Sequence, residues 1–402
     1  MAVSGRRRLV TRLALFTLPA LVAATAIALV AVEIWVRVSW DARRGKPGFY
    51  LSDPVRGLRL GENYDGWFAG VPVHIDNLGL RDPRDYDLAK APNTFRILVL
   101  GDSVTFGHGS LYETTYPRLL EHRLRSWKPD VDWQVWNAAV PGYNTGQELA
   151  QLLEVGPRLQ PDLVVVGFFE NDIIDNRPYA RPTAARRALS AAESFAQRHL
   201  YSLELYKRVY YEAAWRLSPS DEYRRRVQHL GADDAESAVA ADATKRAGQA
   251  LTPFEWLTDE QVRAVNCVFG MRADARVVEA IKASPGYPAW RDAVRGFAEL
   301  EAQHRYRLVF LLNVVPPTCD DVYFYDATRL VNAFYTETFS AAAPTVSVHD
   351  AFLHTHPSQM PSASGHAFGN ANVVKADVLF SFLRDRVLPD ALPAVLRVRA
   401  GR

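Results

Sequence analysis

The first indication of chemistry in this chain is a serine that follows an apolar run. The run extends from Ile97 to Leu100, and Ser103 comes soon after it in the tripeptide Gly-Asp-Ser. A short, continuous apolar run is typical of a strand that is buried on both faces of a parallel sheet. In open α/β sheets, ligands bind at the carboxyl ends of the strands. A serine hydroxyl at that edge can act as a nucleophile if an adjacent base takes its proton.

Three later segments contain the groups that such a nucleophile needs. Gly142 and Asn171 each follow a predicted strand, and His366 precedes the last predicted helix. Histidine is the most common general base. Glycine lets the backbone approach a substrate closely, and the asparagine amide donates N–H groups without a charge that would repel an anion. Donors of this kind stabilise the oxyanion of an acyl-transfer reaction.

In this order, Ser103, Gly142, Asn171 and His366 match the four signature residues of the SGNH (GDSL-type) hydrolase family, which the chain resembles. The resemblance covers roughly residues 95–176 and 305–388. It implies a flavodoxin-like α/β fold and a Ser103–His366 acyl-enzyme mechanism. The oxyanion hole would consist of the backbone N–H groups of Ser103 and Gly142 and the side-chain amide of Asn171. No cofactor is expected.

Other histidines compete with His366 for the role of base. His349, His354 and His356 all lie nearby, and His356 precedes a proline, as the family histidine often does. The distance from His356 to the last predicted helix does not fit the family pattern, and we therefore favour His366.

The chain departs from the family at the acid that usually orients the histidine. The family carries an aspartate two or three residues before its histidine, where this chain has Ser364 and Ala363. A backbone carbonyl could orient His366 instead, or Asp350 could be recruited as a third acid. A third alternative is that catalysis is weak or lost, which would leave a binding module with this fold.

The elements that position these residues alternate between strands and helices. We expect strands near residues 97–100, 133–136, 163–166, 308–312 and 346–348, and helices near residues 116–127, 146–159, 290–304 and 373–386. This alternation predicts a parallel sheet with helices on both faces, a three-layer sandwich.

A long, mostly helical segment at residues 177–287 interrupts that pattern. Leu203, Tyr206, Tyr210, Ala213 and Leu217 recur at steps of three and four, which predicts one stripe of an amphipathic helix. A second helix is predicted at residues 258–269, with an N-terminal capping box. The insertion could pack on the core as a lid, or its aromatic face could bind a membrane surface or a partner.

The N-terminus predicts a membrane anchor. Residues 13–32 carry no charge and are long enough to span a bilayer as a helix. Arginines at positions 6, 7, 8 and 12 precede this run, so the positive-inside rule leaves the N-terminus in the cytoplasm. A cleaved signal peptide is the alternative, because small-residue sites occur within the run. We favour an uncleaved, single-pass anchor in the inner (cytoplasmic) membrane, with the catalytic domain in the periplasm or outside the cell.

Composition sets broader limits. A net charge of +2 over 402 residues gives no electrostatic case for nucleic-acid binding. The two cysteines, Cys267 and Cys319, could form one disulfide or remain free thiols. Neither has a second cysteine or a histidine at the spacing of a metal site, so no metal is expected.

Together these patterns predict four parts and one activity. Residues 1–36 form the cytoplasmic N-terminus and anchor, 37–94 a lead-in segment, 95–176 and 288–390 the catalytic domain, and 177–287 the helical insertion. The expected activity is that of a serine esterase acting on O-acyl esters, O-acetyl esters in particular. Transfer of the acyl group to an envelope glycan is the alternative within the same chemistry. The substrate and any protein partner are not identified by these patterns.

Overall fold

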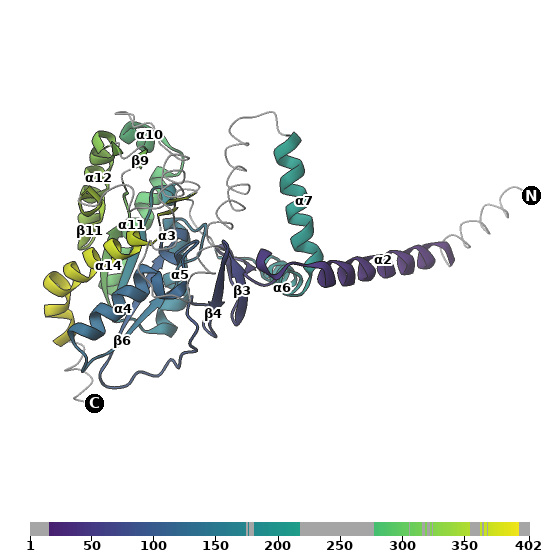
Figure 1. Cartoon of the computed structure of the whole chain (residues 1–402), viewed down its shortest axis with the longest axis horizontal. Coiled ribbons are helices and arrows are strands. Elements are labelled where there is room, and N and C mark those ends of the chain that lie inside the picture. The colour runs from purple at the N-terminus through teal and green to yellow at the C-terminus, as the bar shows by residue number, and fades with distance from the viewer. Residues whose placement is uncertain are drawn as a thin grey trace, which may run out of the picture.

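The computed structural model describes residues 16–173, 176, 181–217, 277–304, 306–315, 318–319, 322–323, 325–353, 362–363, 366–367 and 369–393. Figure 1 shows a layered α/β body from which one N-terminal helix projects. Cys267 and the predicted helix at 258–269 lie outside the described residues, so the disulfide and that helix stay predictions.

A five-stranded parallel sheet forms the centre of the body, in the order β11-β8-β7-β5-β6. Its strands are β5 (Thr94–Gly101), β6 (Asp132–Asn137), β7 (Leu163–Phe168), β8 (Arg307–Leu312) and β11 (Thr345–Ser347). Counted along the chain, this is the flavodoxin-like order 2-1-3-4-5, in which ligands bind where the strand order reverses, between the first and third strands. The predicted fold class and all five predicted strands are confirmed.

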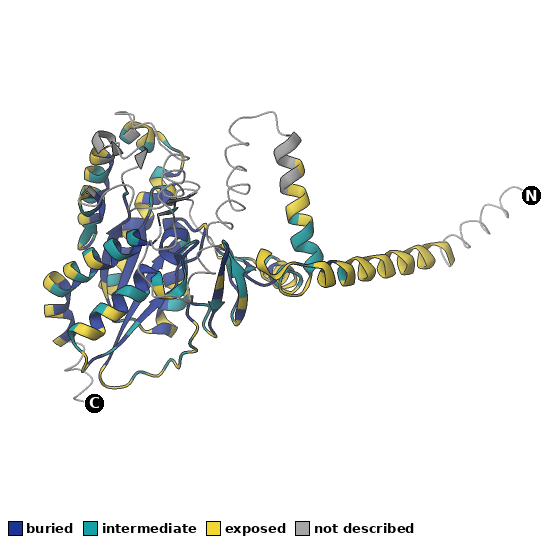
Figure 2. Ribbon diagram, in the orientation of Figure 1, coloured by how far each residue is buried: buried dark blue, intermediate teal, exposed yellow. Residues whose placement is uncertain are grey.

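Helices cover both faces of the sheet because successive strand residues point to opposite sides. On one face, Leu98 and Leu100 pack with α5 (Thr145–Leu159), α11 (Tyr287–Gln303) and α12 (Tyr325–Ser340). On the other face, Ile97 and Val99 pack with α4 (Tyr116–Trp127) and α14 (Asn370–Phe382). Figure 2 shows the strands buried between these two helical layers. Four of these helices were predicted, whereas α12 was not.

Two hairpins form the lead-in segment. They are β1 (Tyr50–Asp53) with β2 (Gly57–Leu60), and β3 (Tyr64–Phe68) with β4 (Val71–Ile75). Val71, Val73 and Ile75 of β4 alternate inward and share an apolar cluster with Phe106 and Tyr143 of the catalytic domain. The lead-in therefore packs against loops that follow β5 and β6.

The N-terminal helix α2 (Leu18–Ser39) is long and apolar enough to cross a membrane. A signal sequence can have the same length and composition. Most of its side chains are exposed, as Figure 2 shows. Its last turns contact α7 (Tyr201–Leu217). Glu33 accepts hydrogen bonds from the N–H groups of Tyr201 and Ser202, and Arg37 donates to the carbonyl of His199. These contacts fix the end of α2 to the insertion.

The described part of the insertion packs on the lead-in, on α2 and on two helices of the α/β body. Helix α6 (Ala184–His199) contacts β1, α7 contacts α2, and α10 (Val277–Ala283) contacts α11 and α12. Tyr206 and Tyr210, from the predicted stripe of α7, are 63% and 54% exposed. The proposal that the insertion covers the active site as a lid stays a prediction.

Candidate active site

Ser103 lies where β5 turns into a short helix. β5 ends at Gly101, and α3 (Ser103–Phe106) follows, capped by the Asp102 carboxylate, which accepts the N–H of Val104 at 2.9 Å. Gly101 has φ +154°, and a Cβ there would lie 2.2 Å from Oγ1 of Thr105. The glycine therefore permits the tight turn that places Ser103 at the carboxyl edge of the sheet, beside the point where the strand order reverses.

His366 reaches Ser103 from the other end of the sequence. It lies in β13 (His366–Ala367), which pairs with β12 (Ser362–Ala363) in a small antiparallel ladder. Its Nε2 atom is 2.7 Å from Oγ of Ser103. That distance suits a general base taking a proton from a hydroxyl. The structure thus brings together the two residues that the sequence analysis paired.

A second histidine supports the first. The ring of His108 stacks on the ring of His366, with 4.2 Å between centroids and 12° between planes. Burial lowers the pKa of His108 to about 4, and the positive charge of Arg81 makes a smaller contribution in the same direction. His108 is therefore neutral at pH 7. The sequence analysis did not identify this residue. Its only signal is its place in the loop after Ser103.

Arg81 of the lead-in holds that loop in place. The guanidinium is buried and donates hydrogen bonds to the backbone carbonyls of Phe106, Gly107 and Ser110. Burial lowers the pKa of Arg81 to about 9, so the side chain remains charged at neutral pH. The lead-in therefore supports this loop through the Arg81 cation and through its apolar contacts with Phe106.

Gly142 and Asn171, the other two predicted site residues, lie on the loops that follow β6 and β7. The N–H of Val140 bonds to the carbonyl of Gly101, which places the first loop beside the turn before Ser103. Gly142 is exposed, has φ +86°, and a Cβ there would meet no atom within 4 Å. Asn171 is exposed, and its side chain hydrogen-bonds the Asp102 carboxyl. Both residues therefore border open space at the edge that carries Ser103.

Four ionisable side chains are buried behind this edge. Burial raises the pKa of Asp102 to about 6, and it raises the pKa of Glu148 and Asp172 well above the usual range, with repulsion among the three carboxyls adding to it. Burial lowers the pKa of Lys375 to about 8, and the nearby Asp102 opposes that effect. The sequence analysis missed this cluster because charged residues are rarely fully buried.

Asp350 lies elsewhere. Its carboxylate is 82% exposed and contacts the neighbouring residue His349, with 2.9 Å between Oδ1 and Nδ1. His349 itself is buried at the start of α13 (His349–Leu353). This geometry favours the view that Asp350 does not serve His366.

With the fold and the site described, the family can be stated. The chain belongs to the GDSL-like lipase/acylhydrolase family, whose model matches residues 99–359. That range includes Ser103, Gly142 and Asn171 and ends before His366. Membership of this family supports chemistry on esters.

Individual relatives are more distant. An arylesterase from Vibrio mimicus is 36% identical over 77 residues, which is 19% of this chain and 38% of that protein. An acetylxylan esterase from Geobacillus stearothermophilus, solved as a catalytic mutant, is 12% identical, with a TM-score of 0.37 over 72% of this chain and 93% of that one. An alpha/beta hydrolase from the Lake Arreo metagenome is 14% identical, with a TM-score of 0.35 over 75% and 96% of the two chains. The fold assignment therefore rests on the strand order of the sheet itself.

Proposed function

We propose that this chain is a membrane-anchored serine esterase that cleaves O-acyl esters, O-acetyl esters in particular, outside the cytoplasm. The observation that carries the proposal is the 2.7 Å contact between Oγ of Ser103 and Nε2 of His366, residues separated by more than two hundred positions in the chain. Membership of the GDSL-like family supports ester chemistry. The acetyl preference is kept from the sequence analysis as part of the proposal.

In the proposed mechanism, Ser103 attacks the ester carbonyl while His366 accepts its proton. The N–H groups of Ser103 and Gly142 and the amide of Asn171 then stabilise the oxyanion. Collapse of the tetrahedral intermediate breaks the ester C–O bond, and the imidazolium of His366 protonates the departing alcohol. Water, deprotonated by His366, releases the acyl group from Ser103.

In this proposal, stacking on His108 orients the ring of His366. His108 holds one face of the ring. Asp350 is occupied by His349. In this proposal no carboxylate orients His366, and Ser103 and His366 work as a dyad.

Labelling with a fluorophosphonate probe tests the nucleophile. Wild-type protein should gain the mass of one adduct, and Ser103→Ala should gain none. Ser126→Ala, which changes an exposed serine on α4, is the matched control and should label like wild type. An adduct on Ser103→Ala would contradict the assignment, and a wild type that neither labels nor hydrolyses acetyl esters would indicate a binding module.

Product analysis then separates hydrolysis from transfer. With an acetyl ester and a glycan acceptor present together, the proposal expects free acetate as the main product. Acetylated glycan as the main product would make the chain a transferase instead.

A further inference from the structure

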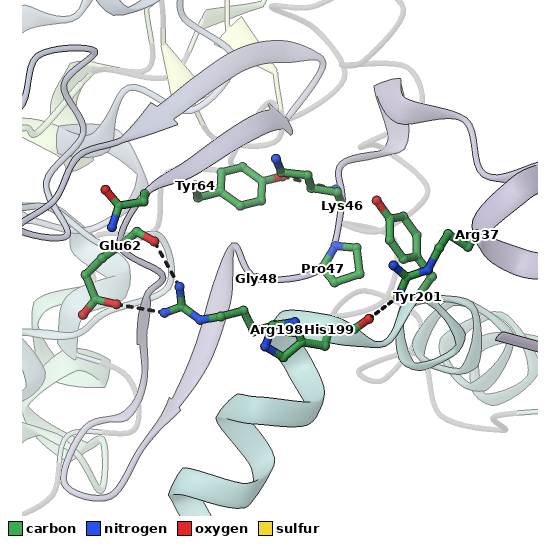
Figure 3. Close-up of a pocket in the computed structure, with 10 residues that line it drawn as sticks. Arg37, Lys46, Pro47, Gly48, Glu62, Tyr64, Arg198, His199 and Tyr201 are labelled. Carbon is green, nitrogen blue, oxygen red and sulfur yellow. Dashed lines mark hydrogen bonds and ion pairs between the residues drawn. The ribbon is translucent and has the colours of Figure 1, made fainter. Parts of the chain in front are cut away.

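A cavity of about 290 Å³ lies where the end of α2, the lead-in and the insertion meet. Its walls come from Arg37 of α2, the segment Lys46 to Gly48, the β2–β3 turn, and the junction of α6 with α7. Figure 3 shows Glu62 and Arg198 on one side, Arg37 and Tyr201 on the other, and Lys46 with Tyr64 between them. The volume is near the lower end of the range for ligand pockets, ~300–1,000 Å³. None of the lining residues belongs to the Ser103 site.

The walls of this cavity carry an excess of positive charge. Arg198 and Arg59 both pair with Glu62, and Arg37 pairs with Glu33. Lys46 has no carboxylate partner in the part of the chain that the structure describes. Because hydrogen bonds from Arg59 and Arg198 outweigh the effect of partial burial, the pKa of Glu62 is lowered and this carboxylate stays charged. Two cationic charges are therefore left uncompensated around the cavity.

The cations are held in place before any ligand arrives. Arg37 donates to the carbonyl of His199 at 2.7 Å and lies over the ring of Tyr201. The Lys46 ammonium lies 5.3 Å from the centre of the Tyr64 ring, and its backbone N–H bonds to the Tyr64 hydroxyl. Burial raises the pKa of Tyr64 to about 12, so that hydroxyl remains a neutral partner. Fixed cations lose less entropy when they bind an anion.

The position of the cavity relative to α2 indicates the kind of anion. A helix of 22 residues spans roughly 33 Å, close to the ~30 Å of a bilayer's hydrocarbon core. Arg37 lies in the last turn of α2, and Trp40 follows the helix and contacts Tyr201. Aromatic and cationic side chains at the end of a span are typical of the headgroup region. The cavity would therefore open at the level of lipid phosphates.

We propose that this cavity binds the phosphate group of an anionic phospholipid headgroup, with Lys46 as the main contact and Arg37 and Arg198 beside it. The inference rests on the membrane anchoring proposed above. A bound headgroup would link the anchor helix, the lead-in and the insertion at one point.

The test uses the full chain in a neutral detergent, titrated calorimetrically with dihexanoyl phosphatidylglycerol. Wild type should bind this lipid saturably, and Lys46→Gln should weaken binding by about fivefold, as expected for one cation at a membrane surface. Lys46→Glu should weaken it further. Lys128→Gln is the matched control, since Lys128 also lies over an aromatic ring, at 5.2 Å from Trp127, but outside the cavity. Thermal unfolding confirms that each variant is folded.

Several outcomes would overturn the proposal. Equal affinity of wild type, Lys46→Gln and Lys46→Glu for the lipid would show that the cavity is not the site. Equal binding of dihexanoyl phosphatidylcholine would remove the preference for an anion. Inorganic phosphate binding as tightly as the lipid would make the ligand a soluble anion.

Ester hydrolysis is measured on the same samples and gives an independent readout. Lys46→Gln should keep wild-type turnover of a soluble acetyl ester, whereas Ser103→Ala should lose turnover and still bind the lipid. If the protein does not hydrolyse esters, the comparison of lipid binding between wild type and the Lys46 variants still tests the cavity. Loss of lipid binding in Ser103→Ala would contradict a site separate from the catalytic centre.

Discussion

At the scale of single residues, the site depends on neutral or buried groups that support the reacting pair. His108 offers a flat face to His366 and carries no charge at pH 7, so it can position the ring without competing for its proton. Arg81 holds the loop that carries His108 through hydrogen bonds to the carbonyls of Phe106 and Gly107. Hydrogen bonds to backbone carbonyls hold the buried Arg81, and ring stacking orients the buried His108.

His108→Ala should lower kcat by about ten- to a hundredfold, because a catalytic group misplaced by about 1 Å can cost that much. His108→Phe should recover most of the loss, since a phenyl ring can stack in the same place. The pH dependence of kcat, measured for all three proteins, should keep the same apparent pKa in the phenylalanine variant. A phenylalanine variant as impaired as the alanine variant would show that the imidazole has a chemical role.

Asp350→Asn should reduce kcat less than roughly tenfold, well short of the loss seen when a true triad acid is replaced. The physical reason is that the Asp350 carboxylate is exposed and contacts His349. Steady-state kinetics on an acetyl ester checks this. A loss of about a hundredfold or more in a folded protein would restore Asp350 as the acid.

At the scale of elements, the sequence predicted the five strands of the sheet and four of the helices that cover it, because these elements have regular apolar patterns. The strands that include Ile97 and Leu163 are continuous apolar runs and were therefore identified. The helix at Tyr116–Trp127 was predicted with the bounds that the structure shows. Helix α12 was not predicted, although its buried residues Val331, Tyr335 and Phe339 recur at steps of four, as on one face of a helix. Of the site, the order of motifs predicted Ser103 and His366.

The remainder of the site arises from tertiary contacts that no local pattern records. His108, Arg81 and Lys375 each act on a partner far away in the chain or on a group that only the folded protein brings near. A buried lysine in a helix has no signal of its own, because a charged residue is normally assigned to the surface.

The loop after β6 offers a test of catalysis separate from stability. Gly142→Ala should still fold, at a cost of about 1–2 kcal/mol for the positive φ, because its Cβ would meet no atom within 4 Å. A methyl group there would narrow the space in which the oxyanion forms. We expect kcat/KM to fall by about tenfold or more, a large part of the effect of one oxyanion donor. Gly57→Ala is the matched control, with φ +87° and the same open space in the β1–β2 turn. Similar kinetics for the two variants would argue against a role for Gly142.

The buried carboxyl of Asp76, in the turn after β4, should make the free energy of unfolding depend on pH. The buried Asp76 carboxyl accepts the N–H groups of Leu78 and Leu80, and burial raises its pKa to about 7. A raised carboxyl pKa stabilises the fold fully at low pH, and that contribution is lost as the pH rises from about 4 to about 7. The free energy of unfolding of wild type should therefore fall relative to Asp76→Asn, by at most ~1.4 kcal/mol per pH unit. A constant difference across this window would contradict the prediction.

At the scale of the whole molecule, α2 and the α/β body are joined by more than a linker. α2 leads through the short helix at Ala42–Arg44 into the first hairpin, and its last turns are bonded to the insertion. Figure 1 shows the body at the C-terminal end of α2, with the other end of this helix pointing away from the body. This arrangement favours opposite sides of a membrane for the N-terminus and Ser103.

A C-terminal fusion to alkaline phosphatase should be active in cells, because that enzyme needs an oxidising compartment. A fusion to a reporter that works only in the cytoplasm should be inactive. Deleting residues 6–12, with their arginines, should weaken this orientation, since the positive-inside bias would be lost. An active cytoplasmic reporter on the intact chain would contradict the topology.

The bonds from Glu33 and Arg37 to the insertion also set how the enzyme can meet its substrate. In an anchored chain, a helix fixed at its exit point cannot swivel like a tether, so any tilt of α2 tilts the sheet and the catalytic serine with it. In such a chain, Ser103 would work at a constant height above the lipid and search in two dimensions as the molecule diffuses. An ester carried on a polymer at that height is accessible over the whole membrane, whereas one a few nanometres further out is never reached.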